Sequence, residues 1–129
     1  MTTELFYLAL VSLLTAVCWL PYVVNRAQVW GLKESMGYPI DQKPLAPWAE
    51  RAKKAHANAV ENLVLFAAVV LTAHLLNKHT GASANAAAFY FWGRLGHYIV
   101  YVAGIPYLRT AFFVVSWLAI LDLIWHILA

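Results

Sequence analysis

The sequence predicts an all-α integral membrane protein, a bundle of four transmembrane helices that forms one domain over residues 1–129. Of its 129 residues, 63% are hydrophobic and 12% are charged, about half the charged fraction of a typical soluble domain. Four long apolar segments lie at roughly 5–24, 55–76, 83–103 and 110–128. Each is close to the about 20 residues that a helix needs to cross about 30 Å of hydrocarbon.

The first apolar segment is predicted to be a retained helix over residues 5–24. A secretory signal peptide opens with basic residues, whereas Glu4 precedes this segment, and no small-x-small cleavage site follows it. Cys18 is the only cysteine and lies inside this helix, so no intrachain disulfide can form. We expect Cys18 to be a small packing residue.

The connection after the first helix is about 30 residues long, which is more than a helical bundle needs. Pro39, Pro44 and Pro47 lie within it and should keep its centre irregular. Pro47 also suits the first turn of a helix, and no residue that ends helices follows before Asn77. The second helix is therefore predicted over residues 47–76, roughly 45 Å long, with its basic start outside the membrane. The connection is thus expected to be partly helical.

The third and fourth helices are predicted over residues 83–103 and 109–128.

The positions of the cations predict the orientation of the protein in the membrane. One side of the membrane holds Arg26, Lys33, Lys43, Arg51, Lys53, Lys54 and Arg109. The opposite side holds only Lys78. The positive-inside rule therefore places the 25–54 loop in the cytoplasm and both termini on the other side, in the inner membrane if the source is bacterial. The net charge of +3 is modest, so no nucleic-acid partner is expected.

Two of the predicted membrane helices carry a polar face. On the second helix, a face about 80° wide contains Arg51, Lys54, Asn58, Glu61 and Asn62. On the third helix, the residues that share one face are Arg94, His97, Tyr98 and Tyr101. His56 points nearly the opposite way from the first group. Counted from the outer helix ends, Glu61 and His97 both lie about 21–23 Å deep, so the two faces are level.

These faces have two interpretations. In the first, Glu61 and Arg94 pair to hold the bundle together, while His97 and the tyrosines are packing and interfacial residues. In the second, a surplus of positive charge binds a small anionic guest. Up to five cations converge with the single membrane-embedded acid Glu61, and they are Arg26, Arg51, Lys54, Arg94 and Arg109. Glutathione fits such a site, because it is a thiol with two carboxylates and an ammonium that Glu61 would bind.

Arg109 lies at the predicted start of the fourth helix. Its charge and the exposed N–H groups of a helix start would together lower the pKa of a bound thiol. A decrease of about two units requires roughly 2.7 kcal/mol of preferential stabilisation of the thiolate. One well-placed guanidinium at a helix start is sufficient for an effect of this size.

At these residues the sequence resembles the MAPEG family, the membrane-associated proteins of eicosanoid and glutathione metabolism. The second-helix pattern of the family, approximately E-R-x-x-R-A-H-x-N-x-x-E-N, is matched by Glu50, Arg51, Lys54, Ala55, His56, Asn58, Glu61 and Asn62. The third-helix pattern R-x-x-H-x-x-x-Y, followed by a proline turn and an arginine, is matched by Arg94, His97, Tyr101, Pro106 and Arg109. The resemblance covers essentially the whole chain, and the compact first loop is similar to that of the bacterial members, which are related to the microsomal glutathione transferases.

The resemblance implies a homotrimer of four-helix subunits that binds glutathione between neighbouring subunits. Together with Asn62 and Tyr98 from the polar faces, the expected glutathione-binding residues are Arg26, Arg51, Lys54, Asn58, Glu61, Asn62, Arg94, His97, Tyr98 and Tyr101. Arg109 matches the arginine that stabilises the thiolate, and Tyr101 would donate a hydrogen bond near the reacting atom. Lys54 stands where the family often has arginine. Lysine keeps the charge but lacks the planar fork, so looser carboxylate binding is expected there.

We therefore predict a glutathione-dependent membrane enzyme of detoxification, which transfers the thiolate to hydrophobic electrophiles or reduces lipid hydroperoxides. The electrophile would enter from the lipid between subunits. The alternative is a non-catalytic membrane protein that binds glutathione or another small anion, or has a structural role. A small transporter is a third hypothesis, disfavoured because the sequence lacks internal repeats. No metal site is expected, since His74 and His79 do not share a helical face.

Overall fold

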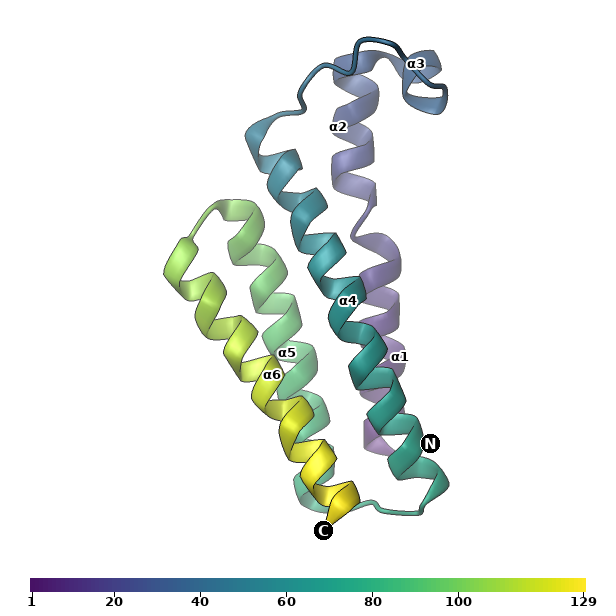
Figure 1. The fold of residues 1–129 in the computed structure, drawn as a ribbon, viewed down its shortest axis with the longest axis vertical. Helices are drawn as coiled ribbons and strands as arrows, with labels where there is room; N and C mark the ends of the chain where they lie inside the picture. Colours follow the sequence, from purple (N-terminus) through teal and green to yellow (C-terminus); the bar gives the residue numbers. More distant parts are fainter.

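A computed structural model describes residues 1–129 and contains only helices and their connections (Figure 1). The six helices are α1 (Thr3–Val17), α2 (Leu20–Trp30), α3 (Leu32–Met36), α4 (Pro47–Leu75), α5 (Gly81–Ala103) and α6 (Pro106–Leu128). The all-α class predicted from the sequence is confirmed. Helices α1, α4, α5 and α6 run alongside one another, both termini lie at one end, and α3 lies at the other end (Figure 1).

Helices α1 and α2 follow each other with a short break, and together they are longer than the predicted helix 5–24. Pro21 lies in the first turn of α2, where its missing N–H interrupts the helical hydrogen bonds. Beyond Pro21 the helix continues to Trp30, because the next residue that ends helices is Gly31, which has a φ of +86°. The predicted range 5–24 ended this helix too early, and Arg26 lies inside α2.

The connection between α2 and α4 is partly helical, as predicted, and it is fastened at two points. The side-chain oxygen of the buried Asn25 accepts a hydrogen bond of 3.0 Å from the backbone N–H of Ala46. The indole N–H of Trp30 donates a hydrogen bond of 2.7 Å to the carbonyl of Lys43. These bonds hold the connection against α2.

The other helix ends are set by capping residues that the apolar pattern does not reveal. Helix α5 starts two residues before the predicted range, since Thr80 caps it in a capping box with Ser83. It ends at Gly104, whose φ is +82°. Helix α6 begins at Pro106 rather than at residue 109. Arg109 therefore lies one turn inside α6, and its own N–H already donates to the carbonyl of Ile105 at 3.3 Å.

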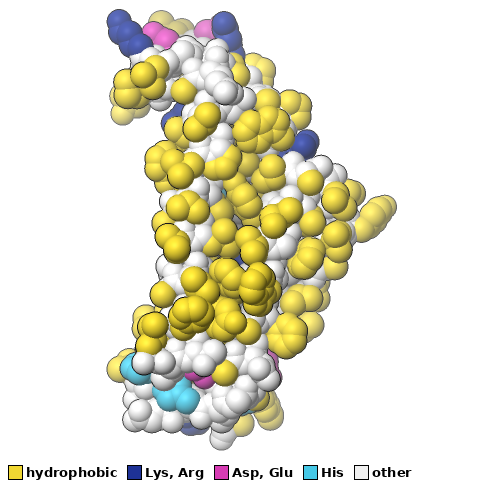
Figure 2. Space-filling model, turned by 180° about the vertical axis from the view of Figure 1, so that it is seen from behind, with side chains coloured by type: hydrophobic (Ala, Val, Ile, Leu, Met, Phe, Trp, Pro, Cys, Tyr) yellow, Lys and Arg dark blue, Asp and Glu magenta, His cyan; other side chains and the backbone are white.

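Three helical segments are long and apolar enough to cross a membrane, as expected for an integral membrane protein. They are Thr3–Trp30, Pro47–Leu75 and Pro106–Leu128. Helix α5 has 23 residues but is not among these segments. Figure 2 shows hydrophobic side chains over the long middle part of one face, with Lys and Arg gathered mainly at the end that carries α3.

The core of the bundle joins α1, α4, α5 and α6. Phe66 and Tyr90 are fully buried and stack with ring centroids 3.9 Å apart. Gly96 lets α5 approach α6 closely, because a Cβ atom there would lie 2.5 Å from the ring of Phe112. At the end with both termini, the buried Glu4 accepts a hydrogen bond from Ser83. These contacts fix the relative positions of the polar faces of α4 and α5.

Candidate functional site

A polar cavity of about 260 Å³ lies between α4, α5 and α6, towards the α3 end of the bundle. The residues that line it are Asn58, His97, Tyr101, Arg109, Thr110 and Phe113. The first four come from three different helices and were all predicted as site residues. Thr110 and Phe113 were not predicted. They follow Arg109 by one and four residues, so helical spacing from Arg109 was the available signal.

Arg109, Tyr101 and His97 form a stacked group in this cavity. The guanidinium carbon of Arg109 lies 4.6 Å from the centroid of the Tyr101 ring. The Tyr101 and His97 rings meet edge to face with centroids 5.4 Å apart. No carboxylate of the chain lies within ion-pair distance of Arg109. The stacking thus fixes the guanidinium while its N–H groups remain free for a ligand.

Arg94 contacts Asn58 on the side away from the cavity. A terminal nitrogen of Arg94 donates a hydrogen bond of 2.7 Å to the side-chain oxygen of Asn58. Arg94 is only 3% exposed and does not line the cavity. The Asn62 side chain donates a hydrogen bond of 2.8 Å to the Asn58 carbonyl, within α4. Arg94 and Asn62 therefore support Asn58, and only Asn58 of the three faces the cavity.

Glu61 and Lys54 face away from the rest of the chain. Both side chains are exposed on α4, and neither makes a hydrogen bond or an ion pair. The interpretation in which Glu61 pairs with Arg94 is wrong, since Arg94 contacts Asn58 instead. A neighbouring molecule or a ligand can reach both Glu61 and Lys54.

Arg51 extends the polar region towards the α5–α6 turn. Its Nε donates a hydrogen bond of 3.0 Å to the carbonyl of Val102. A second cavity, of about 120 Å³, is shared by Arg51, Tyr101 and Arg109 with the turn residues. Gly104 belongs to this turn and was not predicted as a site residue, although a glycine two residues before Pro106 is a signal for a turn. A Cβ atom on Gly104 would lie 3.3 Å from the Arg51 guanidinium carbon.

Two predicted site residues, Tyr98 and Arg26, line neither of these two cavities. The hydroxyl of Tyr98 donates a hydrogen bond of 3.2 Å to the carbonyl of Cys18, at the break between α1 and α2. Arg26 lies over the ring of Trp30, with its guanidinium carbon 5.5 Å from the ring centroid, and lines a different cavity. His56, predicted to point away from the site, is hydrogen-bonded through Nδ1 to the Tyr22 hydroxyl at 2.9 Å.

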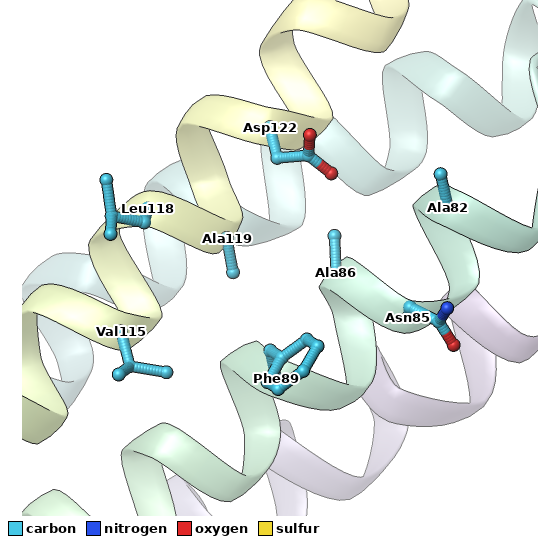
Figure 3. A pocket seen from close by; sticks show the side chains of 8 residues that line it. All are labelled: Ala82, Asn85, Ala86, Phe89, Val115, Leu118, Ala119 and Asp122. Atoms are coloured by element: carbon cyan, nitrogen blue, oxygen red, sulfur yellow. The ribbon is translucent and has the colours of Figure 1, made fainter.

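The largest cavity of the chain, about 440 Å³, is not the candidate site. Figure 3 shows that it lies between α5 and α6 with Ala86 and Ala119 on opposite walls. Its only charged lining residue is Asp122. A cavity with a carboxylate and no cation is unsuited to an anionic thiol ligand. No group of three metal-ligating side chains is close enough together to hold a metal ion.

The helices and the cavity define a helical membrane protein with a cationic polar site between three of its helices. Residues 5–129 match the MAPEG family, and the chain belongs to this family, which includes glutathione transferases and related membrane proteins. Comparisons with curated proteins and with solved structures gave no match. The predicted family is thus confirmed over essentially the whole chain.

Proposed function

We propose that the protein is a glutathione-dependent membrane enzyme, which transfers the glutathione thiolate to hydrophobic electrophiles or reduces lipid hydroperoxides. The observation that carries this proposal is the position of Arg109. Its guanidinium is stacked on Tyr101 at a cavity shared with His97 and Asn58, and no carboxylate neutralises it. Membership of the MAPEG family supports glutathione as the ligand.

Arg109 is assigned to stabilise the thiolate. A full positive charge beside the sulfur, near the N-terminal turn of α6, favours the charged form of the thiol. Lowering the thiol pKa by about two units requires about 2.7 kcal/mol, which one desolvated charge contact supplies. Tyr101 makes no hydrogen bond within the chain through its hydroxyl, so this group is free to donate one near the reacting atom. Bound glutathione supplies the nucleophile for conjugation or peroxide reduction.

The rest of the tripeptide extends over α4. Asn58 donates from its amide group, because Arg94 already occupies its oxygen. Arg51 and Lys54 bind carboxylates, and Glu61 binds the ammonium. Within one chain the cavity of about 260 Å³ is below the 300–1,000 Å³ typical of small-molecule sites, so further walls are needed.

A neighbouring subunit supplies those walls in our proposal. Glu61 and Lys54 are exposed and unpaired on α4, which suits a site closed by a second copy. We assign a homotrimer, the assembly implied by the family. Arg26 can reach glutathione only from a neighbouring subunit, since within one chain it lines a separate cavity. Tyr98 has a structural role at the α1–α2 break instead.

The membrane arrangement follows from the same proposal. Helix α5 also crosses the membrane, as the third of four spans in chain order, because its 23 residues span about 35 Å and it packs against three membrane helices. The α2–α4 connection lies in the cytoplasm and both termini lie on the other side, in the inner membrane if the source is bacterial. The hydrophobic electrophile enters laterally from the lipid.

A non-catalytic glutathione- or anion-binding protein is the second candidate. Lys54 favours it, because an exposed ammonium binds a carboxylate less specifically than the arginine usual in the family. Glutathione-dependent turnover of a substrate distinguishes the enzyme from the non-catalytic binding protein. The purified oligomer is assayed with glutathione and a panel of activated aryl halides, unsaturated carbonyl compounds and lipid hydroperoxides. The enzyme proposal requires glutathione-dependent turnover of at least one class, and its absence with every class rejects it.

A further inference from the structure

The largest cavity of the chain, between α5 and α6, lies at the end of the bundle that carries both termini (Figures 1 and 3). It shares no lining residue with the candidate site, and the proposed function makes no use of it. Its volume of about 440 Å³ falls within the 300–1,000 Å³ typical of small-molecule sites. The cavity is therefore large enough for a second ligand that binds independently of glutathione.

This cavity is polar at one end and apolar at the other. Asp122 lies six residues before the end of α6, about 9 Å from it, and Asn85 lies near the start of α5. Phe89 and Val115 line the opposite end of the cavity, about 10 Å further from these helix ends. The polar end is thus near the membrane surface, and the apolar end is near the hydrocarbon centre.

The carboxylate of Asp122 is not neutralised by a lysine or an arginine of the chain. Nδ1 of His126 lies 3.6 Å from one of its oxygens but only 2.7 Å from the backbone carbonyl of Asp122. Because a carbonyl oxygen can only accept, the N–H of His126 donates to the backbone. The carboxylate therefore receives no hydrogen bond. An unpartnered carboxylate within a membrane helix favours a cationic ligand that donates hydrogen bonds to it.

The apolar walls of the cavity are open to the surrounding lipid. Ala86 and Ala119 are buried on opposite walls, and their small side chains leave space between the two helices (Figure 3). Phe89 is 62% exposed and Leu118 is 51% exposed, so the cavity is accessible from the side of the bundle. A hydrocarbon chain can therefore enter laterally and keep its polar head at the level of Asp122.

We propose that this cavity binds an amphiphile with a primary ammonium head and a single hydrocarbon chain, taken up from the membrane leaflet on the side of the termini. The ammonium donates charge-assisted hydrogen bonds to Asp122 and a further hydrogen bond to the amide oxygen of Asn85. The chain packs against Phe89 and Val115. A phospholipid suits the cavity less well, because its phosphate would lie beside the Asp122 carboxylate.

The test compares three amphiphiles that have the same chain but different heads. The full-length protein in a neutral detergent is titrated calorimetrically with dodecylammonium, with dodecanol and with dodecanoate. Dodecylammonium is expected to saturate at one molecule per chain and to bind at least about tenfold more tightly than the other two. Saturating glutathione should leave this binding unchanged. Equal binding of the three amphiphiles, or no saturable binding of dodecylammonium because a second copy of the chain covers the cavity, overturns the proposal.

A matched pair of acid variants locates the ammonium group. Asp122→Asn keeps the size of the side chain and removes its charge, whereas Glu34→Gln removes an exposed acid on α3 that does not line the cavity. We expect Asp122→Asn to weaken dodecylammonium binding by about tenfold and Glu34→Gln to change it by less than about twofold. Equal effects of the two variants would show that the ammonium does not bind at Asp122.

A second matched pair locates the chain without removing any charge. Ala82→Leu places a larger side chain in the cavity at an exposed position of α5, and Ala111→Leu makes the same change at an exposed position of α6 that does not line it. Ala82→Leu should weaken dodecylammonium binding by about fivefold, and Ala111→Leu by less than about twofold. Full binding in the Ala82 variant would show that the amphiphile lies outside this cavity.

Discussion

The guanidinium of Arg94 donates a hydrogen bond of 2.7 Å to the side-chain oxygen of Asn58, and this contact joins the polar faces of α4 and α5. Arg94 is almost fully buried, so it has been removed from water at a considerable cost in free energy. Asn58 provides its only hydrogen bond to a side chain. The same bond orients the Asn58 amide, because the oxygen faces Arg94 and the NH₂ group is left for the cavity.

Replacing Asn58 should therefore destabilise the bundle. Asn58→Leu removes the acceptor and leaves the buried Arg94 without a partner, which should lower the free energy of unfolding by about 3 kcal/mol. Asn58→Asp is the control, because it retains an acceptor and adds a charge that pairs with Arg94. Thermal unfolding in detergent measures both. Equal stability of the Leu variant and the wild type would contradict the assigned role of this hydrogen bond.

Glu61 is predicted to contribute to glutathione binding and not to the stability of the bundle. Since it has no partner within the chain, Glu61→Gln should change the stability by less than about 0.5 kcal/mol. It should weaken glutathione binding by about tenfold, because the ammonium loses its carboxylate. Calorimetry with glutathione measures the affinity, and Glu34→Gln on α3 controls for the loss of an exposed negative charge. Unchanged affinity in the Glu61 variant would remove Glu61 from the site.

Gly104 is predicted to be essential to the α5–α6 turn. Alanine at a φ of +82° is strained, and its Cβ would press on the Arg51 guanidinium at 3.3 Å. Gly104→Ala should therefore cost about 1–2 kcal/mol of stability and weaken glutathione binding through Arg51. Gly81→Ala is the matched control, since a Cβ atom there meets nothing within 4 Å. A Gly104 variant as stable as the Gly81 variant would show that the turn tolerates a side chain.

Replacing Lys54 with arginine is predicted to increase the affinity for glutathione. Arginine at this exposed position restores a planar fork that binds a carboxylate through two hydrogen bonds. Lys54→Arg should strengthen glutathione binding by about threefold to tenfold, while Lys33→Arg on α3 should leave it unchanged. The two dissociation constants are compared in one detergent and at one ionic strength. If both substitutions have the same effect, Lys54 does not contact a carboxylate of glutathione.

Much of the architecture was predictable because strong signals determine it. Apolar segments of membrane length predicted the all-α class, and two motifs predicted the family. Helix ends were less predictable, since Thr80, Gly31 and Gly104 set them through capping and backbone conformation rather than through apolar periodicity. The first helix was therefore predicted to be too short.

The sequence predicted which helix faces carry the site residues, but not which side chains contact each other. Helical spacing correctly placed Asn58 on one face of α4, and the structure brings it to the same cavity as His97, Tyr101 and Arg109. The spacing does not give the rotation of one helix relative to another. It therefore did not reveal that Arg94 contacts Asn58 instead of Glu61. Trimer formation and orientation in the membrane remain predictions.

The ultraviolet absorbance of the glutathione thiolate in the purified protein tests directly whether Arg109 activates the thiol. Wild-type protein titrated with glutathione at neutral pH is expected to show thiolate absorbance that saturates with binding. In Arg109→Ala the absorbance should be lost, because the stabilising charge is absent, while calorimetry still detects glutathione binding. Thiolate absorbance of equal size in Arg109→Ala, or none in the wild type, would contradict the assignment of Arg109 as the group that activates the thiol.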